Sequence, residues 1–177
     1  FMVSSELSSI DQNQFLTLTD LQGSDSVQLF IESCLEQVSE DAILHVASQG
    51  GYNTLPFLSS EKAFSNTAYY LHEGVDLFPE ENQLSESIGE YVEENLENCV
   101  NFSYFPSVNV TSSAPTADVI ILEESVVVEL NFPLEIVSDI ADVSELQYFS
   151  VEVDSRIATL FEIAKEINQV QMEEGEF

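Results

Sequence analysis

The spacing of apolar residues changes near Asn101, and this change constrains the fold more than any other feature of the sequence. Before Asn101, apolar residues recur every three or four positions, which is helical spacing. After it, short runs rich in Val, Ile, Phe and Tyr alternate apolar with polar residues, which is typical of strands. Helices followed by consecutive strands predict the α+β class.

A first helix is predicted to begin at Ser24 or Asp25, because both residue types are favourable N-caps. It is predicted to end at Gly50 and Gly51, since glycine readily adopts the left-handed conformation that closes a helix. The apolar side of this helix consists of Val27, Ile31, Cys34, Val38, Ala42 and Val46.

A second helix is predicted over residues 79–100, after a loop or extended segment that includes a hairpin arm turning at Gly74. Glu80 and Glu81 lie in its first turn, where the helix dipole favours negative charge. Gly89 costs this helix roughly 1 kcal/mol relative to alanine, which indicates close packing at that position. Its apolar side consists of Leu84, Ile88, Tyr91, Val92, Leu96 and Cys99.

Strands are predicted next, and their short connections favour an antiparallel meander. Glu123–Ser125 is predicted to form a tight turn between two strands of a hairpin. Pro133 cannot donate a backbone hydrogen bond, so its strand is predicted either to lie at the edge of the sheet or to bulge there. The four predicted strands fall within residues 107–113, 117–124, 125–137 and 146–154.

A third helix is predicted after Asp154 or Ser155 as N-cap. Its apolar side consists of Ile157, Leu160, Phe161, Ala164, Ile167 and Gln171. The expected fold therefore has two N-terminal helices, an antiparallel sheet of about four strands, and a C-terminal helix packed on one face. Residues 1–23 are interpreted as an N-terminal arm or linker, 24–171 as a single domain, and 172–177 as a frayed acidic tail.

The charge balance is extreme, with 33 acidic residues against Lys62, Arg156 and Lys165 and a net charge of −30. Such a domain repels itself in dilute buffer, whereas molar salt shortens the Debye length to about 3 Å and screens the repulsion. We interpret the composition as adaptation to high salt. An acidic decoy for a basic partner and a calcium-coated surface are the alternatives. Three basic residues cannot neutralise a phosphate backbone, so nucleic-acid binding is excluded.

The two cysteines, Cys34 and Cys99, both lie on apolar sides of predicted helices. A zinc site needs about four ligands at close spacing, and the two histidines, His45 and His72, do not supply them. A catalytic thiol needs electropositive surroundings, which a net charge of −30 opposes. Two buried thiols and a disulfide both fit the pattern. The even count favours the disulfide, which would imply an oxidising, extracytoplasmic compartment.

Two other features bear on compartment. Asn101 in "NFS" and Asn109 in "NVT" match the N-glycosylation pattern, although a polar Asn also suits the start of a sheet without any sugar. No run of about 20 apolar residues is present. The first residues, "FMVSSELSS", are expected to be the cut end of a longer chain whose missing part is a signal or an anchor.

No zinc-protease, nucleophile-elbow or phosphate-binding motif occurs in the sequence. His72 beside Glu73 is interpreted as a packed histidine. We therefore predict no catalytic residue, no cofactor and no metal, and expect a protein that is not an enzyme. The paired carboxylates are interpreted as solvent-exposed; they are Glu80/Glu81, Glu93/Glu94 and Glu123/Glu124.

Several segments together resemble a group of surface proteins from symbiotic archaea of the DPANN group. These segments are an "ESCL" helix ending in "GGY", a "YYLHEG" segment, a "ENLENC" helix and a closing "RIATLFEIAKEI". The likeness covers roughly residues 26–171. It implies an outside location, a type IV pilin-like N-terminal anchor that is missing here, and a cysteine pair matching Cys34 and Cys99. It implies no biochemical activity, and the acid content suggests a salt-loving lineage such as the nanohaloarchaea.

The leading hypothesis is a non-enzymatic extracytoplasmic domain of a cell-surface protein from a halophilic archaeon, with a structural or adhesive role. Its partners would be other surface proteins, further copies of itself, and the membrane through the anchor. The second hypothesis is a soluble acidic binding module, such as an inhibitor or nucleic-acid mimic, with its acid gathered on one face. The third is a hydrolase whose site no linear motif reveals.

Overall fold

The computed structural model describes residues 24–62, 65–138 and 143–175, so the predicted arm over residues 1–23 lies outside the described residues. Within these ranges the chain combines helices with antiparallel strands, which confirms the α+β class. The helices are α2 (Ser24–Ser48), α3 (Glu81–Cys99), a short 3-10 helix (Phe102–Tyr104) and α4 (Ile157–Glu174). The strands are β1 (Ser59–Lys62), β2 (Ser65–Ala68), β3 (Leu71–His72), β4 (Val75–Asp76), β5 (Val108–Ser112), β6 (Thr116–Ile121), β7 (Ser125–Ser138) and β8 (Ser144–Asp154).

The main sheet consists of β5, β6, β7 and β8, as the alternating pattern predicts. The long strand β7 lies in its centre and pairs antiparallel with β8 along one side. On the other side, β6 pairs with the first half of β7 and β5 with the second half. Strands β5 and β6 are thus two parts of one edge, and the expected tight turn joins β6 to β7 through the Leu122 N–H, which donates to the Ser125 carbonyl over 2.8 Å.

Pro133 marks an irregularity in the centre of the sheet. The register between β7 and β8 shifts between Asn131 and Leu134, so the predicted bulge is confirmed. The alternative prediction of an edge strand is wrong, because β7 is paired on both sides. The Pro133 carbonyl accepts a hydrogen bond from the Ser113 N–H over 3.1 Å. The Pro133 nitrogen carries no hydrogen, so it cannot donate a backbone hydrogen bond. The pairing is interrupted at this point, between β5 and β6.

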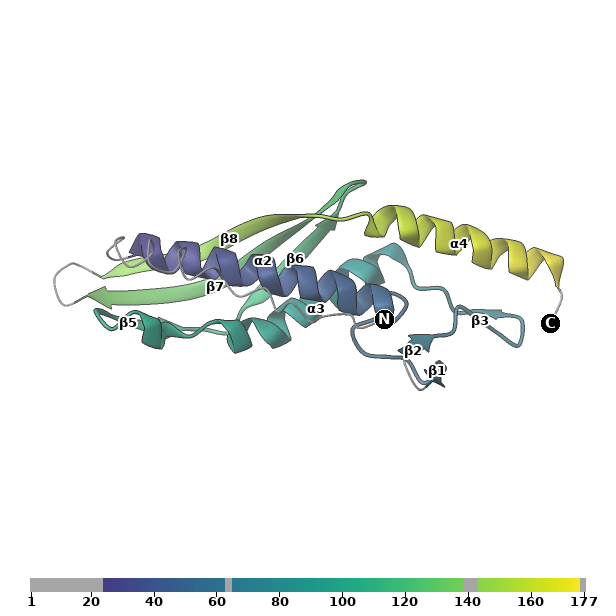
Figure 1. Cartoon of the computed structure of the whole chain (residues 1–177), viewed down its shortest axis with the longest axis horizontal. Coiled ribbons are helices and arrows are strands. Elements are labelled where there is room, and N and C mark those ends of the chain that lie inside the picture. The colour runs from purple at the N-terminus through teal and green to yellow at the C-terminus, as the bar shows by residue number, and fades with distance from the viewer. Residues whose placement is uncertain (1–23, 63–64, 139–142, 176–177) are drawn as a thin grey trace, which may run out of the picture.

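Helices α2 and α3 form a layer over one face of the sheet, with α2 beside β8 and α3 beside β6 (Figure 1). Alternate residues of β7 point into this interface, as a half-buried strand requires. The core between the layers includes Val27, Ile31, Leu35, Val46, Leu84, Ile88, Val92, Leu96, Val126, Val128, Leu130, Phe132, Leu134 and Ile136. All residues predicted for the apolar side of the first helix are buried.

The end of α2 has the hydrogen bonds of a Schellman motif. The Gly50 N–H donates to the Ala47 carbonyl over 3.2 Å, and the Gly51 N–H donates to the Val46 carbonyl over 2.8 Å. Both glycines have positive φ, at 81° and 96°, as expected for the predicted helix stop. The following segment forms two small hairpins, β1–β2 and β3–β4. The turn at Gly74 agrees with prediction, whereas the polar β1–β2 hairpin was not expected from apolar spacing.

The position of α4 differs from the prediction. The helix follows β8 and extends beyond the end of the sheet, instead of packing on a face of it (Figure 1). Only Ile157, Phe161 and Asn168 are buried, while Leu160 and Ile167 of the predicted apolar side are exposed. The N-cap of α4 is Arg156, so the prediction of Asp154 or Ser155 is wrong by at least one residue, although the Ser155 hydroxyl accepts from the Ile157 N–H over 3.2 Å. The helix continues to Glu174, so the prediction of a frayed tail is wrong for residues 172–174.

Candidate functional site

A disulfide joins the two helices of the covering layer. Cys34 on α2 bonds to Cys99, the last residue of α3, with their Cα atoms 5.7 Å apart. Both cysteines lie on the sides that face the partner helix, as the apolar spacing suggested. The alternative of two free thiols does not describe this structure. The bond closes a chain segment of 65 residues and fixes α3 against α2 at one end.

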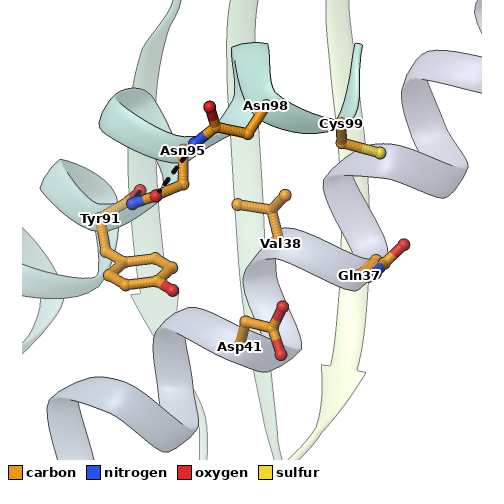
Figure 2. Close-up of a pocket in the computed structure, with 7 residues that line it drawn as sticks. All are labelled: Gln37, Val38, Asp41, Tyr91, Asn95, Asn98 and Cys99. Atoms are coloured by element: carbon orange, nitrogen blue, oxygen red, sulfur yellow. Dashed lines mark hydrogen bonds between the residues drawn. The ribbon is translucent and has the colours of Figure 1, made fainter. Parts of the chain in front are cut away.

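A polar groove of about 360 Å³ lies beside this disulfide, between α2 and α3 (Figure 2). Its side chains form a short chain of hydrogen bonds on α3. The Asn95 amide donates to the Tyr91 carbonyl over 2.9 Å, and the Asn98 amide donates to the Asn95 side-chain oxygen over 3.3 Å. The lining residues are Gln37, Val38, Asp41, Tyr91, Asn95, Asn98 and Cys99. Amides, one carboxylate and one phenol can hydrogen-bond a polar group, but they do not form a nucleophile–base pair.

The two histidines are packed apart from each other. The His45 ring lies 4.7 Å from the Tyr91 ring between centroids, and its Nε2 atom is 3.2 Å from the Asn53 carbonyl oxygen. The His72 ring stacks on Tyr69 with 5.7 Å between centroids. In the described ranges, no group of three or more His, Cys, Asp or Glu side chains could hold a metal ion.

The paired carboxylates do not come together as acid–base pairs. Glu80 is the N-cap of α3, and Glu123 and Glu124 lie in the turn between β6 and β7. Glu93 has a role that its sequence position did not reveal. Its carboxylate accepts a 2.8 Å hydrogen bond from the Ala117 N–H of β6, so it binds the edge of the sheet to α3. No linear signal distinguishes Glu93 from its exposed neighbour Glu94, because the contact spans 24 residues.

Among the described residues, the fold shifts the pKa of two phenols, Tyr52 and Tyr70. Burial raises the pKa of Tyr70, and the neighbouring Tyr52 phenol raises it further. Burial also raises the pKa of Tyr52, whose hydroxyl donates to the Leu77 carbonyl over 3.4 Å. Both shifts favour the neutral phenol.

The two glycosylation acceptor patterns are accessible. Asn101 is exposed at the start of the 3-10 helix, where its side-chain oxygen accepts from the Ser103 N–H over 3.0 Å. Asn109 is exposed on the edge strand β5. The structure therefore places both asparagines at the surface, as glycosylation would require.

Carboxylates cover both layers of the molecule. On the helical layer, exposed acids include Asp25, Glu36, Glu40, Asp41, Glu81, Glu86, Glu90, Glu94 and Glu97. On the opposite face of the sheet they include Asp118, Glu129, Glu135, Glu145 and Glu152. Some are direct cross-strand neighbours, since Asp118 pairs in register with Glu129, and Glu135 with Glu145. Glu135 and Glu145 also line a shallow depression of about 250 Å³ beside Pro133.

No protein-family model matches this chain, and no curated protein or solved structure is significantly similar to it. Among the described helices, none combines the length and the apolar character that a membrane span requires.

Proposed function

We propose that this chain is a non-enzymatic extracytoplasmic domain of a membrane-anchored cell-surface protein from a salt-loving archaeon, with a structural or adhesive role. The observation that carries the proposal is the Cys34–Cys99 disulfide, which holds the two covering helices together. Disulfides persist in oxidising, extracytoplasmic compartments and are rare in a reducing cytosol. The anchor is part of the proposal because the sequence resembles anchored surface proteins of DPANN archaea.

The distribution of charge supports the salt-loving part of the proposal. An acidic inhibitor or nucleic-acid mimic needs its carboxylates on the surface that meets the basic partner. Here exposed carboxylates lie on the outer side of the helices and on the opposite face of the sheet. This arrangement suits a surface that meets salt solution on all sides, and it gives less support to the binding-module alternative.

Immunofluorescence with an antibody to this domain tests the location. We expect the antibody to label intact, unpermeabilised cells of the source organism as strongly as permeabilised ones. An antibody to a cytoplasmic protein is the matched control, and it should label only permeabilised cells. Labelling by the domain antibody only after permeabilisation would refute the proposal.

A further inference from the structure

Helix α4 carries an apolar stripe that no described residue covers. Its members are Leu160, Ile163, Ile167 and Val170, with exposed fractions of 62%, 49%, 55% and 52%. The helix has 18 residues, which corresponds to about 27 Å. It extends past the end of the sheet, clear of both α2 and α3 (Figure 1).

A neighbouring side of α4 is already used within the domain. The Phe161 ring lies 4.9 Å from the Phe78 ring between centroids, and the Asn168 amide donates to the Asp76 carboxylate over 2.8 Å. These contacts hold the helix against the β4 end of the second small hairpin. The stripe therefore lies outside the contacts that attach α4 to the domain.

The stripe has the spacing of a coiled-coil seam. Its members are separated by three, four and three residues, so Leu160 and Ile167 occupy a positions and Ile163 and Val170 occupy d positions. Helices with this spacing pack by inserting each side chain between residues of a second helix. The surface is thus shaped for another helix of similar spacing.

The local charge allows a second copy of this chain to approach. Arg156 and α4, residues 156–174, contain two basic residues, Arg156 and Lys165, and four acidic ones, so their net charge is −2; the acidic residues are Glu162, Glu166, Glu173 and Glu174. The whole chain carries −30. Contact between two copies through α4 therefore leaves nearly all of the repelling charge outside the interface, and it brings both basic residues of this region into or beside the interface.

We propose that α4 is a self-association helix that packs antiparallel against α4 of a second copy. A parallel pair is disfavoured, because a β-branched residue at both d positions favours higher-order bundles over two-stranded coils. In the antiparallel register, Leu160 faces Val170 of the other copy and Ile163 faces its Ile167. The same register brings Arg156 of each copy to Glu174 of the other, which gives two complementary ion pairs at the ends of the seam.

This inference deepens the structural role proposed above, but it can fail independently. Self-association is measured on the purified chain, and cell-surface location is measured on intact cells. A monomeric chain at the cell surface would contradict only the dimer, and a dimer confined to the cytosol would contradict only the location.

Sedimentation equilibrium of the full chain in molar KCl tests the proposal. We expect the mass to rise with concentration from 19.7 kDa to twice that value. The double variant Ile163→Asn/Ile167→Asn should weaken association by at least about 100-fold, because it places polar groups in the centre of the seam. Leu44→Asn is the matched control, since Leu44 is 70% exposed on α2 and should not affect the mass. All substituted positions are exposed, and circular dichroism verifies that each variant is folded.

A charge swap tests the register at the lowest KCl concentration at which the protein is folded. Arg156→Glu and Glu174→Arg should each weaken the dimer by about tenfold, because each variant replaces both ion pairs with contacts between like charges. The combined variant Arg156→Glu/Glu174→Arg should restore most of the affinity. A monomer at all concentrations to about 1 mM, or a dimer unaffected by the Ile163/Ile167 variant, would overturn the proposal. Single charge variants that leave the affinity unchanged would overturn the antiparallel arrangement.

Discussion

Two residues of α3 meet the backbone of the same sheet residue, Ala117. An ideal Cβ placed on Gly89 would lie 2.9 Å from the Ala117 carbonyl oxygen, so the helix and the strand approach closely only because that position has no side chain. One turn further along, the Glu93 carboxylate accepts the Ala117 N–H over 2.8 Å. Both contacts involve backbone atoms of the edge strand β6, which cannot move away without disturbing its pairing to β7.

Gly89→Ala should destabilise the protein although alanine is the better helix former. Overpacking against backbone costs about 1–3 kcal/mol, and the gain in helix propensity offsets at most about 1 kcal/mol of it. We expect a net loss of up to about 2 kcal/mol in the free energy of unfolding, measured by urea denaturation in molar KCl. Glu90→Ala, at an exposed position of the same helix, should change this value by less than about 0.5 kcal/mol. A Gly89→Ala variant that is more stable than the natural chain would show that α3 can move away from β6.

Glu93→Ala should cost about 1 kcal/mol of unfolding free energy, because it leaves the half-buried Ala117 N–H without its acceptor. Glu93→Gln keeps an oxygen acceptor and should recover part of the loss. Glu97→Ala removes an exposed carboxylate from the same helix and serves as the control. Equal stability of the Glu93→Ala and Glu97→Ala variants would contradict a role for the contact with β6.

At the scale of elements, two features have opposite effects on the stability of the fold. The disulfide restrains α2 and α3, which together cover the sheet. The opposite face of the sheet places carboxylates directly across from each other, as in the Glu135–Glu145 pair. Like charges in register on neighbouring strands destabilise a sheet unless salt screens them.

Replacing both cysteines, as Cys34→Ala/Cys99→Ala, should lower the free energy of unfolding by about 4 kcal/mol in the chain-entropy view of a 65-residue closed segment. A reductant should destabilise the natural chain similarly and should leave the double variant unchanged. Thiol titration of the denatured, unreduced protein provides the direct check. Detection of two free thiols would be incompatible with the bond.

Glu135→Lys should stabilise the sheet at low salt, because it converts a like-charge pair with Glu145 into an attractive one. The expected gain is about 0.5–1 kcal/mol, and it should vanish in molar KCl. Glu97→Lys makes the same charge change on α3 and controls for the change in net charge. If the free energy of unfolding rises equally for both variants at low salt, the change in net charge explains the effect. The Glu135–Glu145 pair would then make no specific contribution.

At the scale of the whole molecule, the net charge of −30 dominates. Between described residues the structure has one salt bridge, Lys165–Glu162 at 3.8 Å, and it lies on the surface of α4. The remaining carboxylates repel each other over distances that dilute buffer does not screen. Self-repulsion of this kind favours the expanded, unfolded chain, so the salt concentration should control folding.

The midpoint of urea denaturation should therefore rise with KCl and level off in the molar range. In molar KCl the Debye length is about 3 Å, and repulsion between charges farther apart than this is largely screened. A neutral osmolyte at equal osmolality is the control, because it does not screen charge. A chain that is fully stable without added salt would remove the argument for adaptation to high salt.

Much of the fold follows from local spacing. The periodicity of apolar residues located the helices around Cys34, Leu96 and Phe161 and the four strands of the main sheet, because each element buries one side at its own period. The glycine pair at residues 50–51 ended α2 for a local conformational reason. Helical spacing placed both cysteines on apolar sides, and their even count favoured a disulfide over two buried thiols; the structure contains that bond.

Tertiary packing decided what local spacing left open. It placed β7 in the centre despite Pro133, since the missing N–H could be accommodated where β5 ends and β6 begins. It turned Glu93 toward a strand 24 residues away, which no local pattern encodes. It also divided the apolar residues of α4 into a buried side at Phe161 and an exposed side at Leu160. A sequence shows that a helix has an apolar side, whereas only the arrangement of the other elements determines which part of that side is covered within one chain.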